Sequence, residues 1–156
     1  CTSNAQDDKS KRPSPAAIVT QAINTGATIS IDYSQPSIKG RTIGKDLEPK
    51  EGEVWRTGAN DATTFEVSKD VMINGKALKA GKYALFTIPG EKEWTIIFNK
   101  TPKQWGAYSY KEADDALRVT AKSEANEMAE RFTIKAENAG MVTMMWDKVK
   151  VGFMVK

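Results

Sequence analysis

The stretch VMINGKALKAGKYALFTIPGEKEWTIIFNK, residues 71–100, contains three turn signals between short runs rich in apolar residues. Asn74-Gly75 favours a two-residue β-hairpin, because both residues tolerate a positive φ. Ala80-Gly81 predicts a second turn, and Pro89-Gly90 predicts a third. The short spacing between these turns predicts consecutive antiparallel strands.

Apolar and polar residues also alternate on both sides of this stretch. The alternation is clear in five runs, at 27–33, 65–67, 117–121, 132–136 and 149–155. Since successive side chains of a strand point to opposite faces, each run places its apolar residues on one face of a sheet. Roughly ten short strands predict an all-β fold with little helix, an antiparallel β-sandwich of the jelly-roll or immunoglobulin-like type.

The type of element stays open in two segments. Residues 14–23, SPAAIVTQAI, can start a helix capped by Ser14 or form a first edge strand, because several of them are β-branched. Residues 122–129, KSEANEMA, contain good helix formers and are expected to form a single helical turn or a loop. Asp147-Lys148 is expected to form a tight turn before the last strand.

The composition suits one soluble domain and excludes several kinds of site. The 156 residues include no His, which excludes a His-based catalytic triad, a His-ligated zinc and a histidine pH switch. The single Cys excludes an internal disulfide and a Cys metal cluster, and no motif for a metal or cofactor is present. A net charge of +3 without a basic block argues against nucleic-acid binding. No apolar stretch approaches the length of about 20 residues that a membrane-spanning helix needs.

Residues 1–15, CTSNAQDDKSKRPSP, are predicted to form a flexible tether, followed by a single domain at 16–156. The tether contains only Cys1 and Ala5 as apolar types, too few to offset the entropy lost on ordering. A Cys at position 1 before a polar linker resembles the mature start of a bacterial lipoprotein, whose cysteine carries the lipid. We therefore expect a domain of the cell envelope, anchored through Cys1 at the periplasmic face or surface of a Gram-negative bacterium.

The segment 51–64, EGEVWRTGANDATT, departs from the alternation and is the first candidate for a functional site. Trp55 and Arg56 supply an aromatic plane and a planar five-donor fork, which suit carboxylates, phosphates and sugar hydroxyls. Two further irregular stretches carry similar groups, Lys39-Gly40-Arg41 and the sequence WGAYSY at 105–110.

A structural role stays open for the same residues. A Trp in an all-β protein commonly fills the core, as expected for Trp94 and Trp146, and an Arg beside it commonly pairs with a carboxylate. The carboxylates considered as partners of Arg56 are those of Glu53, Asp61, Glu66, Asp114 and Asp115.

The chain resembles the bacterial DUF2911 family over most of its length beyond the tether. The resemblance lies in residues 52–100, GEVWRTGANDATTFEVSKDVMINGKALKAGKYALFTIPGEKEWTIIFNK, in IDYSQPSIKGRTIG at 31–44, in WGAYSY at 105–110 and in DALRV at 115–119. It implies an exported envelope protein, commonly a lipoprotein, from Bacteroidetes, in a family without an established function. The family signature maps onto Gly40, Arg41, Trp55, Arg56, Gly58, Asn60, Thr63 and Thr64.

Two positions depart from the family pattern. Gln35 stands where many relatives carry Arg, and residues 47–51, LEPKE, replace a more apolar stretch. If the family binds an anion with that Arg, the site of this member is altered.

These observations favour a non-enzymatic binding module of the cell envelope, whose ligand is a glycan, a peptide or a small polar molecule. Loops that carry aromatic and cationic side chains on a rigid β scaffold are a common arrangement for recognition. The predicted ligand-binding residues are Arg41, Trp55, Arg56, Asn60, Thr63, Trp105 and Tyr108.

Two other classes of function remain as alternatives. One is a structural component of an envelope complex, for which the methionines near the C-terminus could provide an adaptable apolar surface. The other, less favoured, is a His-independent hydrolase that uses a carboxylate pair, for which Asp114-Asp115 and Glu51-x-Glu53 are the tight acidic clusters.

Overall fold

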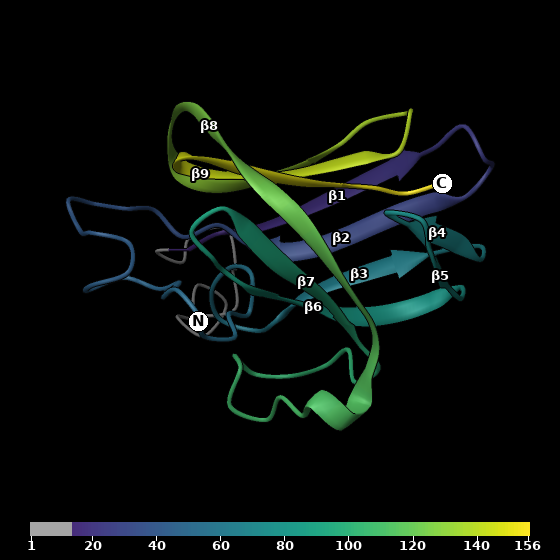
Figure 1. Ribbon diagram of the computed structural model, residues 1–156, viewed down its shortest axis with the longest axis horizontal. Helices are drawn as coiled ribbons and strands as arrows, with labels where there is room; N and C mark the ends of the chain where they lie inside the picture. The colour runs from purple at the N-terminus through teal and green to yellow at the C-terminus, as the bar shows by residue number, and fades with distance from the viewer. Residues whose placement is uncertain (1–13) are drawn as a thin grey trace, which may run out of the picture.

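The computed structural model describes residues 14–156, which form nine strands and one three-residue 3₁₀ helix, η2 (Glu112–Asp114). The strands are β1 (Ala16–Ala22), β2 (Thr28–Ser34), β3 (Thr63–Val67), β4 (Val71–Ile73), β5 (Lys76–Leu78), β6 (Gly81–Ile88), β7 (Glu93–Asn99), β8 (Asp115–Ala136) and β9 (Met141–Met154). The predicted all-β fold with little helix is confirmed (Figure 1). Cys1, the predicted lipid carrier, lies outside the described residues, as does most of the predicted tether.

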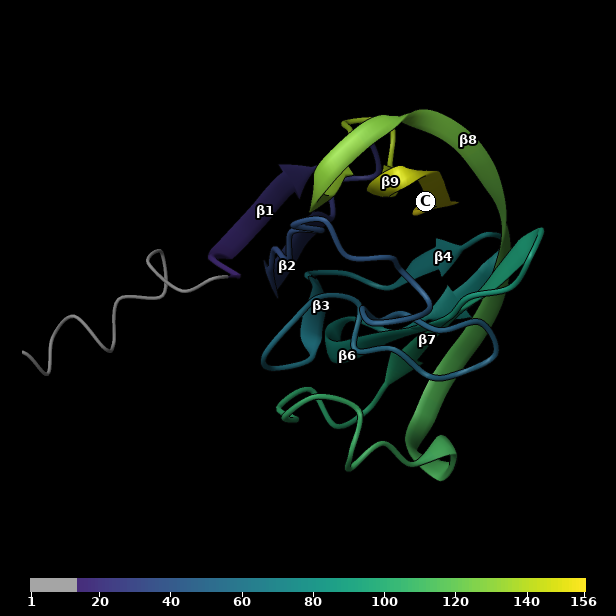
Figure 2. The same cartoon turned by 90° about the vertical axis from the view of Figure 1, so that its left-hand side faces the viewer.

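Seven strands form one antiparallel sheet in the order β1-β2-β3-β6-β7-β8-β9, and β4 and β5 form a separate hairpin. The sheet curls into a half-barrel because β8, 22 residues long, pairs with β7 along its first half and with β9 along its second half. Figure 2 shows β8 arching from the β7 side of the sheet over to β9. The predicted ten-stranded sandwich is therefore not confirmed, since one curled sheet supplies both walls of the core.

Two local predictions in this region are wrong for a shared reason. Residues 122–129, expected as a helical turn or a loop, lie in the middle of β8, and Asp147-Lys148, expected as a tight turn, lies within β9. Ala129 pairs with Asp147, between two register shifts, and Asp147 has a φ of 53°. Such bulges bend a strand without ending it, so turn-forming residues here mark the curl of the sheet.

The hairpin predicted at Asn74-Gly75 is confirmed. It joins β4 to β5, and the two turn residues have φ angles of 47° and 85°. The segment 14–23, for which a helix and an edge strand were both open, contains a strand: residues Ala16–Ala22 form the edge strand β1.

Backbone contacts across the opening of the curl bring distant segments together. The chain beyond β2 pairs with β8, through a hydrogen bond of 3.1 Å from the Ile38 N–H to the Glu130 carbonyl and one of 2.9 Å from the Phe132 N–H to the Pro36 carbonyl. This pairing places the following loop, residues 39–50, beside the second half of β8.

The main core fills the concave side of the sheet, where Phe65, Phe98 and Phe153 meet edge to face. A smaller cluster on the outer side contains Phe86 and Ile97, covered by the chain after β7. The central strands β6 and β7 are thus buried on both faces, which explains why their apolar residues are contiguous instead of alternating. In the described part of the chain, the one helix is far too short to cross a membrane.

Candidate functional site

Trp55 is a core residue. Its side chain is 2% exposed and its backbone pairs with Thr87, at the end of β6. The indole stacks on Trp146, with ring centroids 5.8 Å apart and planes 10° apart, and packs against Phe132 at 5.0 Å. Trp55 therefore packs as a core residue, and its ring lines only a small cavity of about 80 Å³ that it shares with Trp94 and Trp146.

Thr63 is a positioning residue for the loop that precedes β3. It is fully buried, its hydroxyl donates to the Thr57 carbonyl at 2.6 Å, and its N–H donates to the Arg56 carbonyl at 3.1 Å. Between these contacts the chain passes close to β2, where a Cβ on Gly58 would lie 2.9 Å from the Ser34 carbonyl oxygen. Thr57 and Asn60 adopt φ angles of 59° and 62°, a region that L-residues rarely occupy. This closed loop, residues 56–62, fixes where Arg56 and Asn60 point.

Arg41 and Arg56 line the same cavity, of about 380 Å³, between the loop 39–50 and the loop 56–62. We call it the basic cavity, because four of its lining side chains are basic and two are acidic. These are Arg41, Lys45, Lys50 and Arg56, with Asp46 and Glu48. Trp146 also lines the cavity, so one indole both stacks on Trp55 in the core and borders this site.

Neither arginine of the basic cavity forms an ion pair with any carboxylate of residues 14–156. The Arg41 guanidinium donates instead to two backbone carbonyls, those of Ile38 at 3.0 Å and Ser37 at 2.7 Å. The Nε of Arg56 is sealed from solvent and has no hydrogen-bond partner in the described structure. The positive charge that gathers here is therefore not neutralised by the carboxylates predicted as partners.

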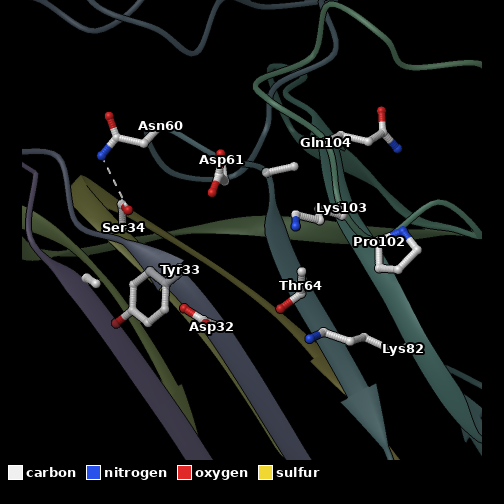
Figure 3. A pocket seen from close by; sticks show the side chains of 12 residues that line it. Asp32, Tyr33, Ser34, Asn60, Asp61, Thr64, Lys82, Pro102, Lys103 and Gln104 are labelled. Carbon is white, nitrogen blue, oxygen red and sulfur yellow. Dashed lines mark hydrogen bonds between the residues drawn. The ribbon is translucent and has the colours of Figure 1, made fainter. Parts of the chain in front are cut away.

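A second cavity, of about 330 Å³, lies on the outer face of the sheet (Figure 3). We call it the outer cavity. Its lining includes Asp32 on β2, Thr64 on β3 and Lys82 on β6, which point away from the main core. The loop 56–62 borders both cavities: Arg56, Gly58 and Ala59 line the basic cavity, whereas Asn60, Asp61 and Ala62 line the outer one. The single site predicted from the sequence is thus divided in two.

Trp105 and Tyr108 are exposed, by 59% and 86% respectively. The segment around Trp105 pairs with the loop 56–62: the Ala62 N–H donates to the Gln104 carbonyl at 2.8 Å, and the Gly106 N–H donates to the Asn60 carbonyl at 3.2 Å. Tyr108 lies against Gly106 beside Arg56, because a Cβ at Gly106 would be 3.3 Å from the Tyr108 ring and 3.2 Å from an Arg56 terminal nitrogen.

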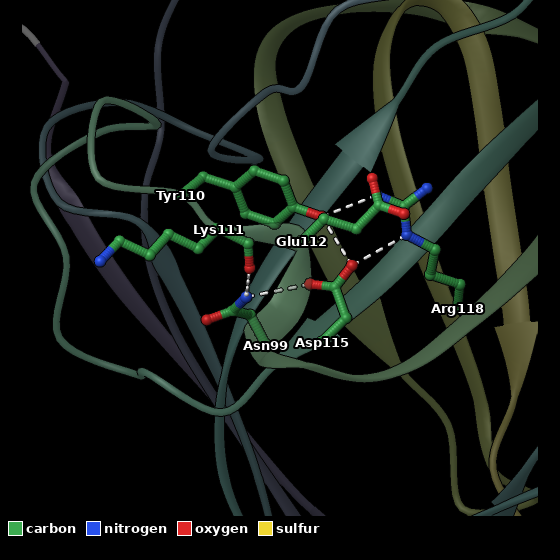
Figure 4. A network of polar contacts seen from close by, with 6 residues as sticks. All are labelled: Asn99, Tyr110, Lys111, Glu112, Asp115 and Arg118. Atoms are coloured by element: carbon green, nitrogen blue, oxygen red, sulfur yellow. Dashed lines mark hydrogen bonds and ion pairs between the residues drawn. The ribbon is translucent and has the colours of Figure 1, made fainter.

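A polar network anchors the chain that carries Trp105 (Figure 4). Asp115 accepts hydrogen bonds from the Tyr110 hydroxyl at 2.6 Å, from the Arg118 Nε at 2.8 Å and from the Asn99 amide at 2.9 Å. Burial, together with the hydrogen bond to Asp115, raises the pKa of Tyr110 to about 12. The hydrogen bond to Asp115 raises the pKa of Arg118. Asp115, considered above for a catalytic pair, is held in this network.

The remaining predictions are located as follows. Gln35, the first of the two predicted departures from the family pattern, lines neither cavity, and its amide nitrogen lies 3.3 Å from the Tyr33 hydroxyl. Sequence reasoning missed Asp32 and Lys82 of the outer cavity, since they come from separate strands, β2 and β6, and follow the ordinary alternation. No group of three His, Cys, Asp or Glu side chains that could hold a metal ion occurs within residues 14–156.

Comparison with known proteins identifies one family. The family model described as a protein of unknown function, DUF2911, matches residues 14–155, nearly the whole chain. No curated protein and no solved structure matches the sequence or the fold.

Proposed function

The chain belongs to the DUF2911 family, and we propose that it is a ligand-binding module whose basic cavity takes a small anionic ligand through a carboxylate or phosphate group. The observation that carries this proposal is the convergence of Arg41 and Arg56 on one cavity without a carboxylate partner in the described structure.

The charge balance of the basic cavity supports an anion. Four basic side chains against two carboxylates give the cavity an excess of positive charge, and like charges repel, so a bound anion relieves an unfavourable arrangement. The planar guanidinium suits carboxylate and phosphate groups, which it can bind through two parallel hydrogen bonds. The volume of the cavity falls within the range of about 300–1,000 Å³ that is typical of small-molecule sites.

The site is also held in place before any ligand binds. Arg41 is oriented by its two backbone hydrogen bonds, and Arg56 by the loop that Thr63 closes. Trp146 borders the cavity from a stacked position on Trp55, where it cannot move independently of the core. A ligand therefore meets a preorganised site, which lowers the entropy lost on binding.

The proposal is tested by isothermal titration calorimetry with inorganic phosphate and with citrate at low ionic strength. We expect the wild type to bind at least one of the two, with an affinity that falls as salt is added. Arg56→Gln removes a charge-assisted hydrogen bond of about 1.5–3 kcal/mol, which weakens binding roughly ten- to 150-fold.

Lys135→Gln is the matched control, because it removes the same charge from an exposed position of β8 outside both cavities. We expect it to retain the wild-type affinity within about twofold, since a distant surface charge is screened. The absence of binding to both probes, or equal losses in the two variants, overturns the proposal.

A further inference from the structure

The outer cavity differs from the basic cavity in position and in charge. It lies on the outer face of the sheet and shares no lining residue with the basic cavity. Two carboxylates, Asp32 and Asp61, and two ammonium groups, Lys82 and Lys103, give it no net charge. An anion therefore has no electrostatic preference for it.

The carboxylates that line the outer cavity are not engaged in ion pairs or hydrogen bonds within the described residues. Within residues 14–156, neither Asp32 nor Asp61 forms an ion pair, and neither carboxylate accepts a hydrogen bond from a described donor. Thr64 adds a hydroxyl between Asp32 and Lys82 (Figure 3). Acceptors, donors and a hydroxyl, which can serve as either, thus face one space of about 330 Å³.

The backbone places an aromatic ring beside this polar cluster. Asp61 and Trp105 are directly opposite each other in an antiparallel bridge, and the flanking hydrogen bonds, from Ala62 and from Gly106, make them a non-hydrogen-bonded pair. In such a pair the two side chains lie on the same face and at the shortest cross-strand distance. Trp105, 59% exposed, is therefore the cross-strand neighbour of Asp61, which itself lines the outer cavity.

We propose that the outer cavity binds a neutral saccharide, with one sugar ring stacked on Trp105 and its hydroxyl groups bonded to Asp61, Asp32 and Lys82. A pyranose ring has a face of C–H groups and an edge of hydroxyl groups. The C–H face suits the negative face of an indole, and the hydroxyl edge requires acceptors and donors together. The outer cavity and Trp105 provide both on adjoining surfaces.

The backbone that carries Trp105 is held in place. Its segment is bonded to the loop 56–62 on one side and is anchored by the network around Asp115 on the other. Because the backbone is already fixed, stacking of the Trp105 ring on a ligand would not have to order this segment first.

The test is an array of neutral oligosaccharides of glucose, galactose, mannose and N-acetylglucosamine, followed by calorimetry with the glycan that binds best. We expect Trp105→Ala to weaken that binding roughly tenfold or more, because the stacking surface is lost. Asp61→Asn, which keeps the shape but removes the charged acceptor, is expected to weaken it as well. Met128→Ala is the matched control: it removes an apolar side chain of similar exposure, 54%, from β8.

The same titration in saturating inorganic phosphate separates this inference from the proposed function. Unchanged glycan affinity supports a site distinct from the basic cavity, and competition by phosphate overturns it. The inference is also overturned when the wild type binds no glycan on the array, or when Trp105→Ala binds as tightly as Met128→Ala. The anion site is tested by titration with phosphate and the saccharide site by titration with a glycan, so each proposal can fail without the other.

Discussion

The indoles of Trp55 and Trp146 are stacked in parallel, with their centroids 5.8 Å apart. Trp55 is buried among core aromatic residues, whereas Trp146 also borders the basic cavity. The pair therefore connects the packing of the half-barrel to the shape of the proposed anion site. It also separates two roles that the sequence motif Trp55-Arg56 suggested together: the Trp stabilises the core, and the Arg faces the cavity.

Trp55→Phe should lower stability and leave phosphate affinity nearly unchanged. The smaller ring leaves a void beside Trp146 and Phe132, which costs about 1–3 kcal/mol of unfolding free energy. Urea denaturation measures the loss, and calorimetry measures the affinity, which we expect to change less than about threefold. A large loss of affinity at unchanged stability would show that Trp55 contacts the ligand.

Gly58→Ala should destabilise the protein more than Gly52→Ala. Both glycines have a positive φ, which costs an alanine about 1–2 kcal/mol. At Gly58 the new Cβ also meets the Ser34 carbonyl at 2.9 Å, whereas nothing lies within 4 Å at Gly52. We expect a further loss of about 1–3 kcal/mol for Gly58→Ala in urea denaturation. Equal losses would show that the close approach to β2 carries no strain.

Thr63→Val should weaken the loop that carries Arg56. Valine has the same shape but cannot donate to the Thr57 carbonyl, which costs about 1–3 kcal/mol for a buried group left without its partner. Thr63→Ser keeps the hydroxyl and is expected to retain most of the stability. Hydrogen exchange of the Thr63 amide reports the same effect locally, and equal protection in the Val and Ser variants contradicts the positioning role.

Tyr110→Phe should reduce the alkaline sensitivity of the fold. The folded pKa of Tyr110, about 12, lies above its ordinary value of 10.0, so the native state holds this proton more tightly than the unfolded state. The resulting stability is fully present below about pH 10 and is lost as the pH rises toward 12.

Urea denaturation on both sides of pH 10 tests this, with a shallower decline expected in the Phe variant. Burial also raises the pKa values of Tyr33 and Tyr83, so the decline should be reduced but not abolished. A decline of unchanged slope contradicts the role of the Tyr110–Asp115 contact.

Local sequence was sufficient for most strands and for the hairpin at Asn74-Gly75. Alternation identifies which side chains face the core, and Asn-Gly tolerates the positive φ angles of a tight turn. Both signals depend on neighbours in the chain. Neither distinguishes two stacked sheets from one curled sheet, because the inner face alternates in the same way in both. The difference lies in β8, whose bulged centre has the composition of a turn.

The residues of the candidate sites were partly recognisable, but their grouping was not. Arg41, Arg56 and Trp105 stood out because they interrupt the alternation. Arg41 and Arg56 share a cavity because Ile38 pairs with Glu130, a residue far away in the sequence.

The amino-acid sequence by itself determined the all-β class, the hairpin at Asn74-Gly75 and the family, since each depends on residue types at short, fixed spacing. Only the tertiary structure decided that Trp55 is buried, that the two arginines line one cavity, and that Asp61 pairs with Trp105. These relationships arise from strand order and register. Both bring together side chains that are distant in the sequence, so the local pattern around each residue does not predict its neighbours in space.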